Sequence, residues 1–268
     1  MADPRSPYGA LIASRIRAQR SYPLSFRWDV ASSLLVGVVE FAEVWVVFTR
    51  VPVFGGLDLN AILLVFGLSN LTFAAADLTT GHLDRIPTYI RAGTIDVFYL
   101  RPLTLIGQLV SSDFQLRRLA RLAVGATVLA IGLARNDVPL DLRTVTILLM
   151  TFVCGYLIFA TLFIAAAGAQ FFLVNGAEVT NAFTYGGVFA AGQPAAVFPD
   201  PLKILFGYVF PTVFTGYLPA VALLGLPGAP PLLPAELVWF MPLAAGWMAG
   251  VGLLLWRLGV RHYQGAGG

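Results

Sequence analysis

The sequence contains few of the residues that build disulfides, metal sites or nucleotide sites. Among 268 residues there is one cysteine, Cys154, which excludes an intrachain disulfide and a cysteine-rich metal site. The chain has two histidines, which are few for the ligands of a hydrolytic metal centre. The sequence contains no His-Glu-x-x-His motif, no nucleophile elbow and no glycine-rich phosphate loop with lysine. We therefore expect no catalytic residues, no metal site and no cofactor in this chain.

Charge is also scarce, whereas apolar residues are abundant. Charged residues make up 12% of the chain and hydrophobic residues 58%, with a mean hydropathy of +0.80. This composition indicates an all-α polytopic membrane protein. The first long apolar run starts only after Trp28, so it does not resemble the early apolar core of a cleaved signal. We expect it to be a permanent span.

Six segments are candidates for transmembrane helices, which need about 20 mostly apolar residues. The fifth is weakly apolar and rich in glycine, but small residues are tolerated in spans that pack against other helices. The expected spans are 29–49, 58–78, 115–134, 144–170, 177–198 and 237–256. Between the last two, residues 199–226 contain Pro201, Pro211 and Pro219, which break helices. We expect an extracytoplasmic re-entrant region of two short helices there.

The distribution of basic residues predicts the orientation. With both termini in the cytoplasm, the cytoplasmic segments hold 13 of the 17 Lys and Arg residues, as the positive-inside rule requires. Because the basic residues are spread over separate cytoplasmic ends, nothing predicts a nucleic-acid partner. No internal repeat suggests an inverted-repeat carrier.

Residues 1–28 are expected to form a cytoplasmic interface helix. Its apolar residues fall on one helical face and its arginines elsewhere, the pattern of a helix that lies on a membrane surface. The apolar face comprises Tyr8, Leu11, Ile12 and Ile16, and the arginines are Arg15, Arg17 and Arg20. Two interpretations stay open: the helix anchors the chain on anionic lipid, or it holds a partner.

Residues 79–114 form the only sizeable cytoplasmic loop of this topology. The loop is too apolar for a solvated connector. The stretch 81–122, which includes most of it, has six arginines and three aspartates and is too charged to span. Gly93 followed by Thr94 and Asp96 predicts a helix stop and a capped restart, and Arg101-Pro102 ends the second helix. We expect two short helices with a corner, whose apolar side is covered by protein or lipid.

Two motifs resemble a known family. The stretch AGTIDVFYLRPLT after the second span is similar to a signature of the membrane subunits of type-2 ABC exporters, the ABC-2 permease family. The fuller IRAGTIDVFYLRPL…Q…SSDFQLRRLARL resembles the branch near daunorubicin and viologen export permeases, as does the tail WRLGVRHYQGAG. The resemblance covers essentially the whole chain as a single transmembrane domain, 1–268.

The resemblance implies the permease subunit of an ATP-driven exporter in the bacterial inner membrane, moving a hydrophobic or amphipathic compound outward. The partners would be an ABC ATPase dimer, which binds ATP and Mg, and a second permease chain, identical or paralogous. The cytoplasmic loop would be the coupling helix that docks on the ATPase. The residues implied are Tyr89, Ile90, Arg91, Gly93, Thr94, Asp96, Phe98, Tyr99 and Arg101. The alternative is that this loop packs only against its own spans.

Four polar residues lie within the first two expected spans. Glu40 and Glu43 are three apart, hence on one helix face, and charge at bilayer depth is costly. They either line a translocation path or cation site, or lie hydrated near the outer end of the span. Asn70 and Asp77 are candidates for the same path or for interhelical hydrogen bonds.

A rival hypothesis is a polytopic membrane enzyme that acts on lipid, using Asp77, His82 and Asp84 as a metal or acid–base cluster. An alternative interpretation of these three residues is that they lie in a loop at the membrane edge. A third hypothesis for the chain is an ATP-independent carrier.

Overall fold

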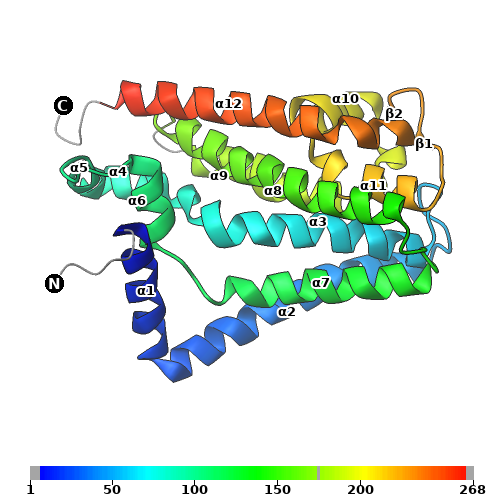
Figure 1. Cartoon of the computed structure of the whole chain (residues 1–268), viewed down its shortest axis with the longest axis horizontal. Coiled ribbons are helices and arrows are strands. Elements are labelled where there is room, and N and C mark those ends of the chain that lie inside the picture. Colours follow the sequence, from blue (N-terminus) through cyan, green and yellow to red (C-terminus); the bar gives the residue numbers. More distant parts are fainter. Residues whose placement is uncertain (1–6, 174–175, 264–268) are drawn as a thin grey trace.

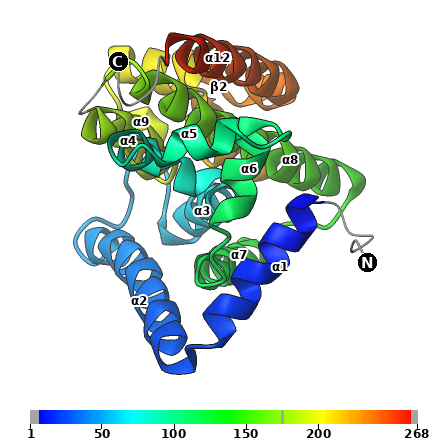
Figure 2. The ribbon, with the colours of Figure 1, turned by 90° about the vertical axis from the view of Figure 1, so that its left-hand side faces the viewer.

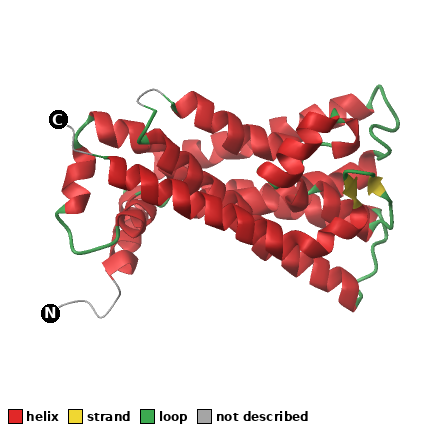
Figure 3. Cartoon of the chain, turned by 90° about the horizontal axis from the view of Figure 1, so that it is seen from above, coloured by secondary structure: helices red, strands yellow, loops and turns green. Residues whose placement is uncertain are grey.

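The protein is a bundle of helices, described by a computed structural model over residues 7–173 and 176–263. Helices make up nearly all of it, and two short strands lie at one end (Figure 3). Within the described residues, four helical segments are long and apolar enough to cross a membrane: Pro23–Phe48, Leu59–Arg91, Leu142–Gln170 and Ala235–His262. They contain helices α2 (Pro23–Phe48), α3 (Leu59–Thr80), α8 (Leu142–Gln170) and α12 (Met241–His262). The expectation of an all-α membrane protein thus agrees with the structure.

Helices α7 (Arg118–Arg135) and α9 (Ala177–Ala191) occupy two of the six expected spans but are shorter. With 15 residues, α9 is about 22 Å long, less than the hydrocarbon thickness of about 30 Å. Helix α9 ends at Ala191 because Gly192 forms its C-cap and the backbone of Pro194 is extended. Membrane crossing by these two helices stays a prediction.

Glycine residues allow the long helices to approach closely. An added Cβ at Gly67 of α3 would lie 2.6 Å from the backbone of Leu129 in α7, and one at Gly168 of α8 would lie 2.5 Å from the backbone of Leu255 in α12. Small residues at such crossings are typical of membrane bundles. These glycines therefore allow the backbones to come close in the pairs α3–α7 and α8–α12.

The expected re-entrant region is broken in the structure. Its helical pieces form two runs, Asp200–Val209 and Thr212–Leu223, interrupted at Pro211. The first run contains α10 (Asp200–Ile204) and η3 (Leu205–Val209), and the second contains η4 (Thr212–Thr215) and α11 (Tyr217–Leu223). Tyr217 and Leu218 are almost fully buried. The second run is thus covered by protein, whereas much of the first, including Ile204 and Tyr208, is exposed. The depth of both runs in a membrane stays a prediction.

Short elements complete this end of the molecule. Before the broken region, η2 (Ala195–Val197) follows α9. After it, strands β1 (Gly228–Ala229) and β2 (Leu233–Pro234) pair antiparallel, and η5 (Ala235–Phe240) leads into α12.

The opposite end gathers the short helices of the expected cytoplasmic loop. These are η1 (Gly81–Arg85), α4 (Ile86–Arg91), α5 (Thr94–Tyr99) and α6 (Leu105–Ser112). Helix α1 (Pro7–Arg20) and the carboxyl end of α12 lie at this same end (Figure 1). The segments predicted to be cytoplasmic therefore gather at one end of the molecule. Helix α1 then meets α2 at an angle, so that the two form an open V beside α7 (Figure 2).

Two apolar clusters fill the interior. The larger joins α3, α8, α9, α11 and α12. The smaller, which we call the coupling core, lies beneath α4 and α5 and ties them to the ends of α8 and α12. Its buried members are Leu83, Ile86, Ile95, Leu109, Ala167, Phe171 and Trp256.

Candidate functional site

The expected coupling segment, α4 and α5, is built around Gly93. Its φ of +64° lies in the left-handed region, which costs a residue with a Cβ roughly 1 kcal/mol or more. The Thr94 hydroxyl donates back to the Tyr89 carbonyl at 3.2 Å. The structure therefore contains the corner predicted from the sequence, with Gly93 rather than Thr94 at the N-cap position of α5.

One side of the segment packs onto its own chain. Ile86 and Ile95 are fully buried, and Tyr89, Ile90 and Phe98 pack partly buried against the same coupling core. Tyr89, Ile90 and Phe98, three of the nine residues implied for docking on the ATPase, thus anchor the segment to α8 and α12. This buried side holds the two short helices rigidly on the long ones.

The other side is apolar and exposed. Leu100 is 84% exposed, and Val97 and Tyr99 are about half exposed. Sequence reasoning named Tyr99 but missed Val97 and Leu100. The helical period could have found Val97, because with Ile95 and Phe98 turned inward it must face outward. This exposed patch is the free apolar surface of the segment.

The polar residues of the segment have distinct partners. Arg101 lies over the Phe98 ring, 5.9 Å from its centroid, and Arg91 Nε donates to the Pro87 carbonyl at 3.2 Å. Asp96 accepts a 2.8 Å hydrogen bond from the Tyr263 hydroxyl. Burial and this hydrogen bond raise the pKa of Tyr263 to about 12. Arg91 and Arg101 remain exposed, whereas Asp96 is already held within the chain.

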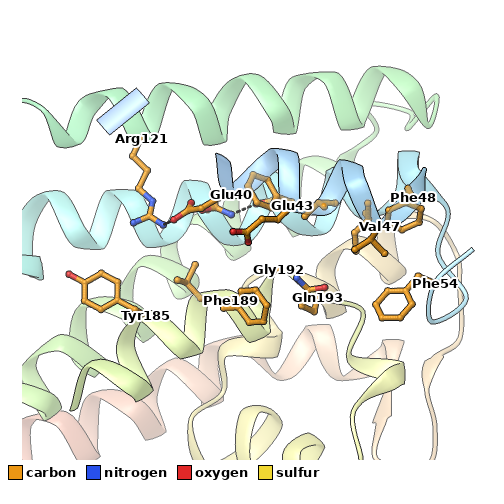
Figure 4. A pocket seen from close by; sticks show the side chains of 15 residues that line it. Glu40, Glu43, Val47, Phe48, Phe54, Arg121, Tyr185, Phe189, Gly192 and Gln193 are labelled. Atoms are coloured by element: carbon orange, nitrogen blue, oxygen red, sulfur yellow. Dashed lines mark hydrogen bonds and ion pairs between the residues drawn. The ribbon is translucent and has the colours of Figure 1, made fainter. Parts of the chain in front are cut away.

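A second candidate site is a cavity of about 460 Å³ between α2, α3, α7 and α9, which we call the central cavity (Figure 4). Three of the four residues predicted for a translocation path line it: Glu40, Glu43 and Asn70. Apolar side chains make up most of the remaining wall, including Val44, Val47, Phe48, Phe54, Ile62, Phe66, Val188 and Phe189. Its size is that of a small-molecule site.

Glu40 and Glu43 differ in their surroundings although they share a helix face. Glu40 forms a 2.5 Å ion pair with Arg121 of α7, whose guanidinium lies 4.7 Å from the centroid of the Phe73 ring. No side chain within the described residues pairs with Glu43. Sequence reasoning did not identify Arg121 as the partner of Glu40. Glu40 therefore joins two helices, and Glu43 is the free acid of the cavity.

Asp77 does not line the central cavity. It forms an ion pair with Arg118 at the start of α7, with 3.2 Å between Oδ1 and Nη1. Both side chains are nearly buried. This agrees with the interpretation of Asp77 as an interhelical partner. Arg118 and Arg121 thus give α7 one ionic contact to α3 and one to α2.

The three residues of the enzyme hypothesis take separate partners. Asp77 pairs with Arg118, His82 Nε2 contacts the Leu109 carbonyl, and Asp84 accepts from the Tyr185 hydroxyl at 3.2 Å. Over the described part of the chain, no three His, Cys, Asp or Glu side chains gather as metal ligands. The geometry thus gives no support to a metal-dependent lipid enzyme.

Comparison with known proteins identifies a family. Residues 34–267 match the family described as ABC-2 family transporter protein. No curated protein and no solved structure matches the chain. Because the family match covers most of the chain, from α2 through α12, the chain belongs to the ABC-2 transporter family and is a membrane permease component of an ABC transporter.

Proposed function

We propose that this chain is the permease subunit of an ABC exporter that moves a hydrophobic or amphipathic compound out of a bacterial cell. A separate ABC ATPase dimer binds ATP and Mg²⁺ and docks on α4 and α5. A second permease chain, identical or paralogous, completes the transmembrane unit. The protein lies in the inner membrane with both termini in the cytoplasm. Family membership, which implies an ABC ATPase partner, supports this proposal.

The observation that carries the proposal is the exposed apolar patch of Val97, Tyr99 and Leu100, flanked by Arg101. A patch of this kind on a rigid corner is typical of a protein-binding surface. The opposite side of the corner packs into the coupling core together with Phe171 of the α8 end and Trp256 of α12. A displacement of the patch by a bound ATPase would therefore move two long helices, α8 and α12.

The central cavity supports transport of a compound with an apolar part. Its walls are mainly aliphatic and aromatic, and its few polar groups come from Glu40, Glu43, Asn70, Arg121 and Gln193. An apolar wall with a small number of polar groups is the usual construction of a small-molecule site. The cavity lies between α2 and the more buried α3, so a movement of α2 would change its width.

Co-purification from the native host tests the proposal. We expect the tagged chain, extracted in mild detergent, to carry an ATPase with a glycine-rich phosphate loop. Leu100→Asp should reduce the captured ATPase at least about 30-fold, since a central interface residue contributes about 2 kcal/mol or more.

Leu140→Asp is the matched control, because Leu140 is also exposed, at 75%, but lies between α7 and α8 at the other end. It should leave the captured ATPase unchanged. If the intact wild-type chain is recovered without any ATPase, the proposal fails and an ATP-independent carrier is favoured.

A further inference from the structure

A second cavity, of about 550 Å³, lies between α1, the start of α2 and the segment 113–117. We call it the interface cavity. It belongs neither to the coupling segment nor to the central cavity. Its charged lining residues are Arg15, Asp29, Asp113 and Arg117, and its aromatic ones are Tyr22 and Phe26. It lies at the end of the molecule that holds α1 and the coupling segment.

The Gln19 side chain holds this cavity in shape. Its amide nitrogen donates to the Phe114 carbonyl at 2.5 Å, and its amide oxygen accepts from the Leu116 N–H at 2.9 Å. These two bonds fasten α1 to the segment before α7. Arg15 lies four positions before Gln19 and hence on the same helix face. The cavity is therefore fixed by specific bonds.

The charges around the cavity are unequally compensated. Asp113 is already paired, with Arg85 at 3.3 Å and with the Gln115 amide at 2.8 Å. Arg117 uses its Nε to donate to Gln115 at 2.8 Å, which leaves its terminal nitrogens free of any bond within the described residues. Over the part of the chain that the structure describes, the Arg15 and Asp29 side chains also have no ion-pair or hydrogen-bond partner. Two guanidinium groups, from Arg15 and Arg117, and one carboxylate, from Asp29, are thus available to a ligand.

Aromatic residues indicate the level of the membrane at which the interface cavity lies. Tyr22, at the N-cap of α2, is 72% exposed, and Trp28, in the second turn of α2, is 68% exposed. Amphipathic aromatic residues gather at the level of lipid headgroups. The apolar surface of α2, which is largely unburied, continues from this level into the membrane. A ligand with a charged head at the cavity and acyl chains along α2 matches both features.

We propose that the interface cavity binds the zwitterionic headgroup of an aminophospholipid. The phosphate lies between Arg15 and Arg117, since guanidinium groups bind phosphate oxygens strongly. The primary ammonium group donates to Asp29. Such a lipid connects α1 to α2 and thereby fixes α1 against α6, where the Thr104 N–H donates to the Tyr8 hydroxyl. This site is separate from the cargo path and from the ATPase surface.

The test uses the full chain in nanodiscs of mixed phosphatidylethanolamine, phosphatidylcholine and phosphatidylglycerol, followed by native mass spectrometry of the retained lipids. We expect about tenfold enrichment of phosphatidylethanolamine over phosphatidylcholine, whose quaternary ammonium cannot donate to Asp29. Asp29→Asn should abolish this enrichment. Arg15→Gln and Arg117→Gln should lower retention of all three lipids, whereas Arg20→Gln, outside the cavity lining, should change nothing. Asp29 is exposed, so this variant should fold, as gel filtration can verify.

Equal retention of phosphatidylethanolamine and phosphatidylcholine would overturn the proposal, as would an unchanged preference in Asp29→Asn. If inorganic phosphate displaces the lipid as well as soluble phosphoethanolamine does, the cavity is a simple phosphate site and the proposal also fails. If the variants leave lipid retention unchanged but release the ATPase, the cavity faces that subunit instead.

Discussion

The Tyr263 hydroxyl donates a 2.8 Å hydrogen bond to Asp96, a residue 167 positions earlier in the chain. The Tyr263 ring also stacks on Tyr99, with 6.0 Å between the centroids and 8° between the planes. The two sequence motifs that resemble the ABC-2 family therefore meet in space. Tyr263, directly after α12, is bonded to α5, so under the proposed docking a movement of α5 would be carried into the last long helix.

Tyr263→Phe should loosen α5 without displacing the ring. The substitution keeps the stacking on Tyr99 but removes one hydrogen bond, a net contribution of about 1 kcal/mol. We expect amide hydrogen exchange across residues 94–100 to become roughly fivefold faster. Tyr22→Phe, at an exposed tyrosine far from α5, should leave that exchange unchanged. Equal rates in wild type and Tyr263→Phe would show that the bond does not hold α5.

The same bond has a predictable pH dependence. Burial, which is the largest cause, and the hydrogen bond to Asp96 together raise the pKa of Tyr263 from 10.0 to about 12. A raised tyrosine pKa means that the neutral hydroxyl is favoured in the folded state, so its contribution is complete below pH 10.0 and is lost as the pH rises through about 12. The difference in exchange between wild type and Tyr263→Phe should therefore be constant throughout the neutral range.

Gly93→Ala should strain the corner of the coupling segment. At a φ of +64° an alanine costs about 1 to 2 kcal/mol, whereas asparagine tolerates this region better. We expect less ATPase to be captured by Gly93→Ala than by Gly93→Asn, with equal membrane insertion of both. Ala92→Ser, beside the corner at a φ of −83°, should behave as wild type. If both Gly93 variants capture wild-type amounts of ATPase, the corner geometry is not required for docking.

Glu40→Gln should destabilise the protein, whereas Glu43→Gln should not. The first change leaves Arg121 without its anionic partner in a partly buried position, which costs about 1 to 3 kcal/mol. The second removes a carboxylate that has no partner among the described residues. Thermal unfolding in detergent should show a lower midpoint for Glu40→Gln alone. Exchanging the charges, with Glu40→Arg and Arg121→Glu together, should recover part of the loss, and equal midpoints for the two single variants would contradict the assignment.

Gly168→Ala should separate α8 from α12. The new methyl group would lie 2.5 Å from the Leu255 backbone, and overpacking of this kind costs about 1 to 3 kcal/mol. Gly250→Ala in α12 is a control, because its Cβ would meet nothing within 4 Å and alanine favours helix. We expect a lower unfolding midpoint for the first variant and an equal or higher one for the second. The reverse order would exclude close packing at Gly168.

The long helices and the Gly93 corner could be predicted because their signals are local. Long runs of apolar residues predict the helices α2, α3, α8 and α12. The order of Gly93, Thr94 and Asp96 predicts a break between two short helices. These properties depend on residues within a turn or two of one another. The exposed position of Val97 follows from the same helical period and could have been found.

The pairings between distant residues could not be predicted in this way. Nothing near Glu40 in the sequence identifies Arg121 as its partner, because that contact depends on how α2 crosses α7. The bond between Asp96 and Tyr263 likewise depends on the packing of α12 against α8. The length of α9 was overestimated, since glycine and proline after Ala191 end the helix although apolar residues continue.

Site-specific cross-linking from Leu100 tests the docking of the ATPase on α5 most directly. Cys154 is buried and is the chain's single cysteine, so a variant with Cys154→Ser and Leu100→Cys offers one exposed thiol. We expect a short thiol-to-amine cross-linker to join position 100 to the ATPase subunit in native membranes, whereas Leu140→Cys, at the opposite end, should give no such product. If position 140 cross-links to the ATPase and position 100 does not, α5 is not the docking site and the proposed coupling is wrong.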